Sequence, residues 1–171
     1  MTTELVDDRV YRLDLGIVNA YLVDDGETTL IDAGTPTATD DLRAALEDAG
    51  YGERDLDRVL LTHFDVDHVG TLADLAFDGP IHAAEPDASF LDGSRTPPVS
   101  NRKGAFQRVA NLFLTRPSAP VRRVAEGASV GGFDAHHTPG HTPRPTGYVH
   151  AALVAVLLGA LVAEPGGSLT P

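Results

Sequence analysis

The sequence contains no cysteine, and Lys103 is its only lysine. The absence of cysteine excludes disulfides, iron–sulfur clusters, thiolate zinc sites and cysteine nucleophiles together. Any metal ion must therefore be bound by nitrogen and oxygen atoms. The other basic residues are arginines, and aspartate greatly outnumbers glutamate. This bias predicts a protein adapted to high salt.

Long apolar runs and targeting signals are also missing. The longest apolar run, residues 151–163, is shorter than the roughly 20 residues that a helix needs to cross a bilayer. Residues 1–4 are polar and lack the basic-then-apolar pattern of a secretory signal. A length of 171 residues with 42% hydrophobic content predicts one domain, residues 1–171, with a buried core. We therefore expect a cytoplasmic protein with no membrane partner.

A shortage of positive charge excludes another class of partner. The chain has 25 acidic and 13 basic residues, which give a formal net charge of −12. The acidic residues are spread along the chain, as on a solvated acidic surface. Because nucleic acid is bound by basic surfaces, we expect no nucleic-acid partner.

The apolar pattern predicts alternating strands and helices. Residues 18–32 indicate a hairpin with Asp24-Asp25-Gly26 at its turn. A helix is predicted from Thr39 to Gly50, where apolar residues recur at helical spacing. Further along, we expect strands at 58–61 and 80–84, helices at 69–75 and 105–114, and a flap or insertion near the site at 93–120. Residues 148–163 fit either one helix or two strands.

Potential metal ligands are concentrated in one short segment. His63, Asp65, Asp67 and His68 lie on the loop between the predicted strand 58–61 and the helix that follows it. Imidazole and carboxylate bind zinc, iron(II) and manganese(II), and alternation along an extended loop directs several of them to one point. The alternative is an acidic loop with incidental histidines. A later histidine, His141, follows a Pro-Gly turn and is the candidate for a further ligand; His136 and His137 compete with it, whereas His82 and His150 lack ligand-like neighbours.

These motifs resemble those of the metallo-β-lactamase superfamily. Thr62-His63-x-Asp65-x-Asp67-His68 is similar to its first metal motif, and residues 137–143, which contain Pro139-Gly140-His141, are similar to its second. Ile31-Asp32-Ala33-Gly34 resembles an earlier motif, in which the buried aspartate supports the metal ligands from behind. The resemblance implies an α/β fold, a four-layer αββα sandwich, whose C-terminal part is incomplete here.

The resemblance also implies chemistry, that of a metal-dependent hydrolase. The family usually holds two zinc ions (Zn2+) bridged by hydroxide, so His63, Asp65 and His141 correspond to the first metal site and Asp67 and His68 to the second. The metal lowers the pKa of bound water toward ~7 and polarises a carbonyl or phosphoryl oxygen. Asp67 additionally orients the hydroxide, as the catalytic residue. The expected partner is a small-molecule ester, thioester, lactone or phosphoester.

Departures from the family pattern leave alternatives open. Asp65 replaces a more usual histidine, which admits Fe2+ or Mn2+ beside Zn2+. Ala160 stands where the family has a bridging aspartate, and the sequence ends at Pro171, before the family's last histidine. Arg144 adds a bulky cation after the second motif, which either binds an anionic substrate or opposes a cation. The alternatives are a catalytically impaired metal-binding relative and a mononuclear iron protein acting on oxygen or persulfide.

Overall fold

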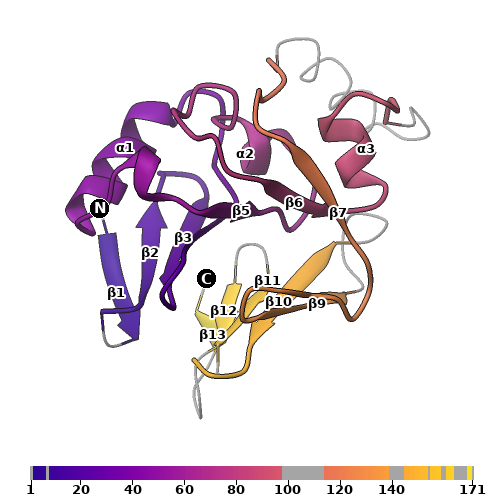
Figure 1. Ribbon diagram of the computed structural model, residues 1–171. Helices are drawn as coiled ribbons and strands as arrows, with labels where there is room; N and C mark the ends of the chain where they lie inside the picture. The colour runs from indigo at the N-terminus through magenta and orange to yellow at the C-terminus, as the bar shows by residue number, and fades with distance from the viewer. Residues whose placement is uncertain are drawn as a thin grey trace.

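Two β-sheets packed face to face carry the site (Figure 1). The computed structural model describes residues 2–6, 8–97, 114–138, 145–153, 155–158, 161–163 and 169–170. A core cluster between the sheets joins Tyr21 and Leu60 of the first sheet to Phe133 and Tyr148 of the second. A second cluster lies between the first sheet and the helices on its outer face.

The first sheet has seven described strands, and their order across the sheet follows their order in the chain. Strands β1 to β4 run antiparallel, whereas β4 to β7 run parallel. The strands are β1 (Thr2–Val6), β2 (Val10–Asp14), β3 (Asn19–Asp24), β4 (Thr28–Ile31), β5 (Arg58–Leu60), β6 (Ile81–Ala84) and β7 (Val121–Val124). The parallel half places the carboxyl ends of β4, β5 and β6 at one edge.

The second sheet is antiparallel throughout its described strands, in the order β13-β12-β11-β10-β9-β8. Its strands are β8 (Ser129–Val130), β9 (Phe133–His137), β10 (Thr146–His150), β11 (Ala155–Leu158), β12 (Leu161–Ala163) and β13 (Leu169–Thr170). Within the apolar run at 148–163, which fitted either a helix or two strands, the described residues 148–150, 155–158 and 161–163 are therefore strands of this sheet.

Helices cover the outer face of the first sheet. They are α1 (Thr39–Asp48), α2 (Val66–Val69), α3 (Asp87–Leu91) and the short 3-10 helix η1 (Glu53–Asp55). Three of the four layers of the expected αββα sandwich are thus described, since no helix covers the second sheet within the described residues. Nor is any helix of this described part long and apolar enough to cross a membrane.

Most of the predicted elements are confirmed, with one helix displaced. The hairpin at 18–32 corresponds to β3 and β4, and Gly26 at its turn has φ 104°. The helix predicted at 69–75 instead ends at Val69, and residues 70–75 form turns. The physical reason is that the Gly70 N–H bonds to the carbonyl of Gly34 and not to one in its own helix. The predicted helix at 105–114 and most of the proposed flap at 93–120 lie outside the described residues. The described parts of the flap, 93–97 and 114–120, contain no helix or strand.

Candidate metal centre

The candidate ligands lie at the shared edge where β4 and β5 end. Asp32 directly follows β4, and residues 61–65 lead from β5 into α2. The Asp32 N–H donates to the Leu60 carbonyl at 3.0 Å, which joins the two strand ends. Carboxyl ends of parallel strands converge side chains on one crevice. The structure therefore brings Asp32 beside the His63–His68 segment, 31 to 36 positions along the chain.

Asp32 is the buried centre of this arrangement. Its side chain is 1% exposed, and its backbone has φ 58°, a left-handed conformation that aspartate and asparagine tolerate better than most residues. Its carboxylate accepts hydrogen bonds from the Thr62 N–H at 2.9 Å, the Thr62 hydroxyl at 2.7 Å and His68 Nδ1 at 2.8 Å. Burial raises the pKa of Asp32, but the charge and hydrogen bond of His68 and the bond from Thr62 outweigh burial and hold the pKa below its usual range.

These bonds decide which ring nitrogen of each histidine carries the proton. An ionised Asp32 only accepts, so His68 Nδ1 must be the donor. The Thr62 hydroxyl gives its single proton to Asp32, so at 3.1 Å it accepts from His63 Nδ1. In the neutral form of each ring the proton therefore lies on Nδ1, and Nε2 carries the lone pair that a metal ion needs.

The two Nε2 atoms face carboxylates. His63 Nε2 lies 3.5 Å from Asp65 Oδ2, and His68 Nε2 lies 3.8 Å from Asp67 Oδ2. The two imidazole rings are tilted by 48° to each other, with centroids 4.0 Å apart. Burial lowers the pKa of His68, but the neighbouring carboxylates, Asp32 first, raise it to about 8. The segment thus holds two imidazole–carboxylate pairs side by side.

This donor set fits a metal ion in its chemistry. Both nitrogens and both carboxylates are ligand types for zinc, iron(II) or manganese(II), and the Nδ1 bonds orient the rings as those of metal-binding histidines are oriented. Within the described residues, however, no three such side chains are grouped closely enough to hold an ion by themselves. His141, Arg144 and Ala160 lie outside the described residues. The roles of His63, Asp65, Asp67, His68 and His141 as ligands stay predictions.

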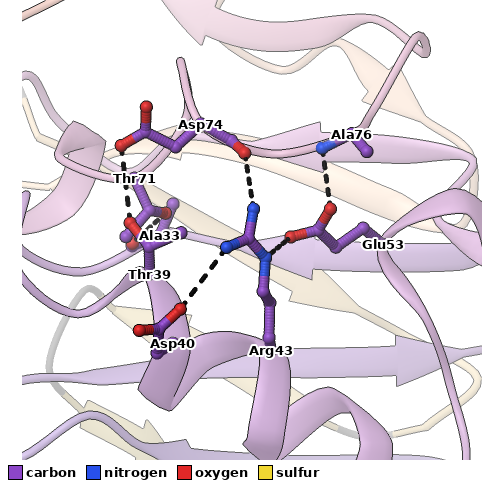
Figure 2. Close-up of polar contacts among 8 residues, drawn as sticks. All are labelled: Ala33, Thr39, Asp40, Arg43, Glu53, Thr71, Asp74 and Ala76. Carbon is purple, nitrogen blue, oxygen red and sulfur yellow. Dashed lines mark hydrogen bonds and ion pairs between the residues drawn. The ribbon is translucent and has the colours of Figure 1, made fainter.

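Close backbone packing and hydrogen bonds together hold the His63–His68 segment in position. The loop after Asp32 passes so close to Gly70 that a Cβ there would lie 2.2 Å from Pro36 N, so only glycine fits. Ala33 binds both flanks, because its N–H donates to the His68 carbonyl and its carbonyl accepts from the Thr71 hydroxyl. Beyond Thr71, Figure 2 shows Arg43 of α1 bonded to Glu53 and to the Asp74 carbonyl, while Glu53 also accepts from Ala76 N–H.

Two hydrogen bonds from strand β10 of the second sheet also hold the residues that lead into the His63–His68 segment. The Thr146 N–H donates to the Thr62 carbonyl at 2.7 Å. The Tyr148 hydroxyl, which is fully buried, donates to the Leu61 carbonyl at 3.1 Å. The position of the histidines therefore depends on how the two sheets pack, and β10 connects them.

Sequence reasoning missed Asp87, a buried carboxylate beside the segment. Asp87 begins α3, three positions after β6 ends at Ala84, and it accepts a hydrogen bond from the Phe64 N–H. Burial raises the pKa of its carboxyl to about 6, with His63 and the Phe64 bond opposing the shift. An acidic residue just after a third parallel strand was the available signal, since β6 ends at the same edge as β4 and β5.

The other histidines lie away from this segment. His150 is buried, and its Nε2 bonds to Asp25 at 2.8 Å at the far end of β10. His136 and His137 are on β9, where both face Glu126 at 3.5 and 3.7 Å. His82 is half-buried on β6. Within the described residues, none of the four is grouped with His63 or His68 as a metal site.

Comparison with known proteins identifies the family. The family model described as the metallo-beta-lactamase superfamily matches residues 13–152, which is most of the chain. The chain belongs to this superfamily. A curated relative, the uncharacterized protein YobT of Bacillus subtilis (strain 168), is 30% identical over 158 residues, which cover 88% of this chain and 64% of YobT.

Solved metallo-β-lactamases share the fold. MIM-1 from Novosphingobium pentaromativorans matches with a TM-score of 0.71 and 19% identity, over 98% of this chain and 58% of MIM-1. BJP-1, a subclass B3 metallo-β-lactamase of Bradyrhizobium japonicum, matches with a TM-score of 0.65 and 23% identity, over 98% of this chain and 59% of BJP-1. The chain thus spans less than two thirds of the length of these superfamily members, and at such identities the likeness extends to the fold.

Proposed function

We propose that this superfamily member is a metal-dependent hydrolase of a small ester, thioester, lactone or phosphoester. The observation that carries the proposal is the pair of bonds leading from Asp32, one directly to His68 and one through Thr62 to His63. When the rings are neutral, these bonds keep the proton on Nδ1 and leave both Nε2 atoms available as metal ligands. An incidental acidic loop would have no need of a buried carboxylate that orients two imidazoles.

Five residues supply the proposed ligands. His63, Asp65 and His141 would hold the first metal ion, and Asp67 and His68 would contribute to a second. Zinc suits this set, and the carboxylate of Asp65 also admits iron(II) or manganese(II). When bound, such an ion lowers the pKa of coordinated water and polarises a carbonyl or phosphoryl oxygen.

The residues of the chain have distinct tasks in this proposal. Asp32 and Thr62 orient the imidazoles, and the burial of His63 and His68, 3% and 5% exposed, excludes competing water from the rings. Asp67 is the most accessible of the carboxylates, with a side chain 39% exposed, and would orient the attacking water. The substrate therefore approaches from the side of Asp67.

Metal content is the first test. The purified protein should contain bound metal by plasma mass spectrometry. His63→Ala should abolish that content, whereas the matched variant His82→Ala, on the same sheet, should retain it. Wild-type protein without metal after incubation with zinc, manganese or iron(II) would refute the proposal. Hydrolysis of a panel of simple esters, thioesters, lactones and phosphodiesters with each metal would then identify the reaction.

One observation favours a second candidate, a metal-binding relative with little or no hydrolytic activity. The described side chains form two pairs of donors and no group of three. This candidate predicts metal binding with no turnover on the whole panel. It also predicts that Ala160→Asp, which restores a carboxylate at the position of the family's bridging aspartate, raises metal occupancy or rate. Iron(II) as the metal retained on purification would instead favour oxygen or persulfide chemistry.

A further inference from the structure

A separate cavity lies behind the candidate metal centre. It has a volume of about 340 Å³ and lies between α2, α3 and the segments 93–97 and 114–117. Figure 1 shows the chain that precedes β7 passing close to α2 and α3. Its apolar lining includes Phe64, Phe90, Leu91 and Leu114. This volume is within the range of small-molecule binding sites, which are mostly apolar with a few polar groups.

The cavity and the candidate ligands lie on opposite sides of the same loop. The lining of the cavity includes Phe64 but neither of its neighbours in the chain, His63 and Asp65. His63 and Asp65 point toward each other, 3.5 Å apart, while the Phe64 ring packs against Phe90 with centroids 5.8 Å apart. A molecule in the cavity would therefore touch Phe64 and reach neither His63 nor Asp65.

Two arginines make part of the wall of this cavity positive. Arg95 and Arg116 both line it, and neither forms an ion pair with another residue of the described chain, whereas nearby Arg123 binds Glu85 and Asp92. The Arg116 guanidinium lies against Gly93, where a Cβ would be 2.1 Å from Arg116 Cζ. The missing side chain at Gly93 is therefore what lets the guanidinium lie there.

Charge decides the class of ligand. The chain carries a formal net charge of −12, so an anion is repelled from most of its surface. Guanidinium groups bind carboxylates through charge-assisted hydrogen bonds. An apolar chain alone would not need the arginines, and a cation would be repelled by them.

We propose that this cavity binds a monocarboxylate with a medium-length apolar chain. The chain lies against Phe64, Phe90 and Leu91, and the carboxylate is held at Arg95 and Arg116. This site is independent of the proposed hydrolase function, because its residues include none of the candidate metal ligands.

Calorimetric titration of the purified protein with octanoate tests the proposal. We expect saturable binding of one octanoate per chain and at least tenfold weaker binding of octan-1-ol, which has no charge. The double variant Arg95→Gln/Arg116→Gln removes both charges at exposed positions and should weaken octanoate binding at least tenfold. The control Arg122→Gln, at an exposed arginine on β7, should leave the affinity unchanged.

Several results would overturn the proposal. Absence of saturable binding at millimolar octanoate is one, and equal affinities for octanoate and octan-1-ol are another. An equal loss in Arg122→Gln would mean that only the overall charge matters. His63→Ala should bind octanoate as the wild type does; loss of binding in this variant would place octanoate at the candidate metal centre and refute the separate site. Because metal content is measured independently, failure here leaves the hydrolase proposal intact.

Discussion

Replacing Asp32 with asparagine tests the orientation of both histidines with minimal change in shape. Asparagine has the same size and tolerates the left-handed conformation at φ 58°, so the substitution introduces no backbone strain. The amide, however, has one acceptor oxygen where the carboxylate has two. In the wild type, the Thr62 hydroxyl and His68 Nδ1 both donate to Asp32. If the asparagine oxygen accepts from the Thr62 N–H, the NH2 group of the asparagine faces these two donors.

The expected cost follows from these contacts. A hydrogen bond to a charged group contributes about 1.5–3 kcal/mol. Two of the three hydrogen bonds to the Asp32 carboxylate are replaced by weaker neutral ones, so we expect Asp32→Asn to lose roughly 3 kcal/mol of unfolding free energy. His68 Nδ1 must then accept from the amide, which moves the ring proton to Nε2. Because a protonated Nε2 cannot bind a metal ion, metal affinity should fall by about 10- to 100-fold.

Asp8→Asn provides the matched control. Asp8 also has a left-handed backbone, φ 55°, but it is exposed. Its substitution removes the same charge and should change stability by less than about 0.5 kcal/mol. Urea unfolding of the metal-free variants measures stability, and competition with a chromophoric chelator measures metal affinity. If Asp32→Asn bound metal as tightly as Asp8→Asn, the argument from the ring proton would be wrong.

Three further substitutions address stability. His150→Ala should cost about 3 kcal/mol in urea unfolding, because it empties a buried site and removes the hydrogen bonds of His150 to Asp25 and to the Leu153 N–H. His136→Ala, at a half-exposed side chain, should cost under about 0.5 kcal/mol, and equal losses would contradict this. Gly131→Ala should cost at least about 1 kcal/mol more stability than Gly127→Ala. Both glycines have positive φ, but only a methyl group at Gly131 would meet the buried Arg58, 2.6 Å from its Cζ; similar melting temperatures of the two variants would refute this. Burial raises the pKa of Asp87 from 3.8 to about 6, so ionising it costs folded-state free energy and stability should fall as the pH rises from about 4 to 6. Metal-free Asp87→Asn should therefore be more stable than wild type at pH 7 by roughly 2–3 kcal/mol and equal to it below pH ~4; no gain at pH 7 would show that the carboxylate is not strained by burial.

Local patterns were sufficient to predict the elements that hold the candidate ligands. Asp24-Asp25-Gly26 predicted the hairpin because glycine accepts the positive φ that its turn requires. The strand before His63 was predictable because a strand in a parallel sheet is buried on both faces and reads as an apolar run. In contrast, β1 and β2 contain polar and half-exposed residues, and α3 is only five residues long. The sequences of these three elements therefore cannot be distinguished from that of a loop.

The supporting contacts of the site could not be predicted, because they join distant parts of the chain. Tyr148 and Leu61 are 87 positions apart, and β10 had no unique assignment from its uniform composition. Asp87 approaches Phe64 only after β6 has paired with β5. Asp32 was the exception. Its position behind the candidate ligands was expected from the resemblance to the superfamily and not from the pattern of residues.

The two ends of β10 connect the sheets by different means, and the difference bears on the candidate metal centre. At one end Thr146 and Tyr148 donate to backbone carbonyls of the ligand segment, while at the other His150 contacts Asp25, which also lies 3.8 Å from Arg58. Backbone acceptors stay in place when side chains are replaced, so most substitutions in the ligand segment should leave this contact unchanged. Loss of the His150 contact, by comparison, would loosen the far end of β10 while the metal-site end stays bonded. His150→Ala should therefore reduce unfolding free energy and leave metal affinity close to that of the wild type, whereas Asp32→Asn should reduce both.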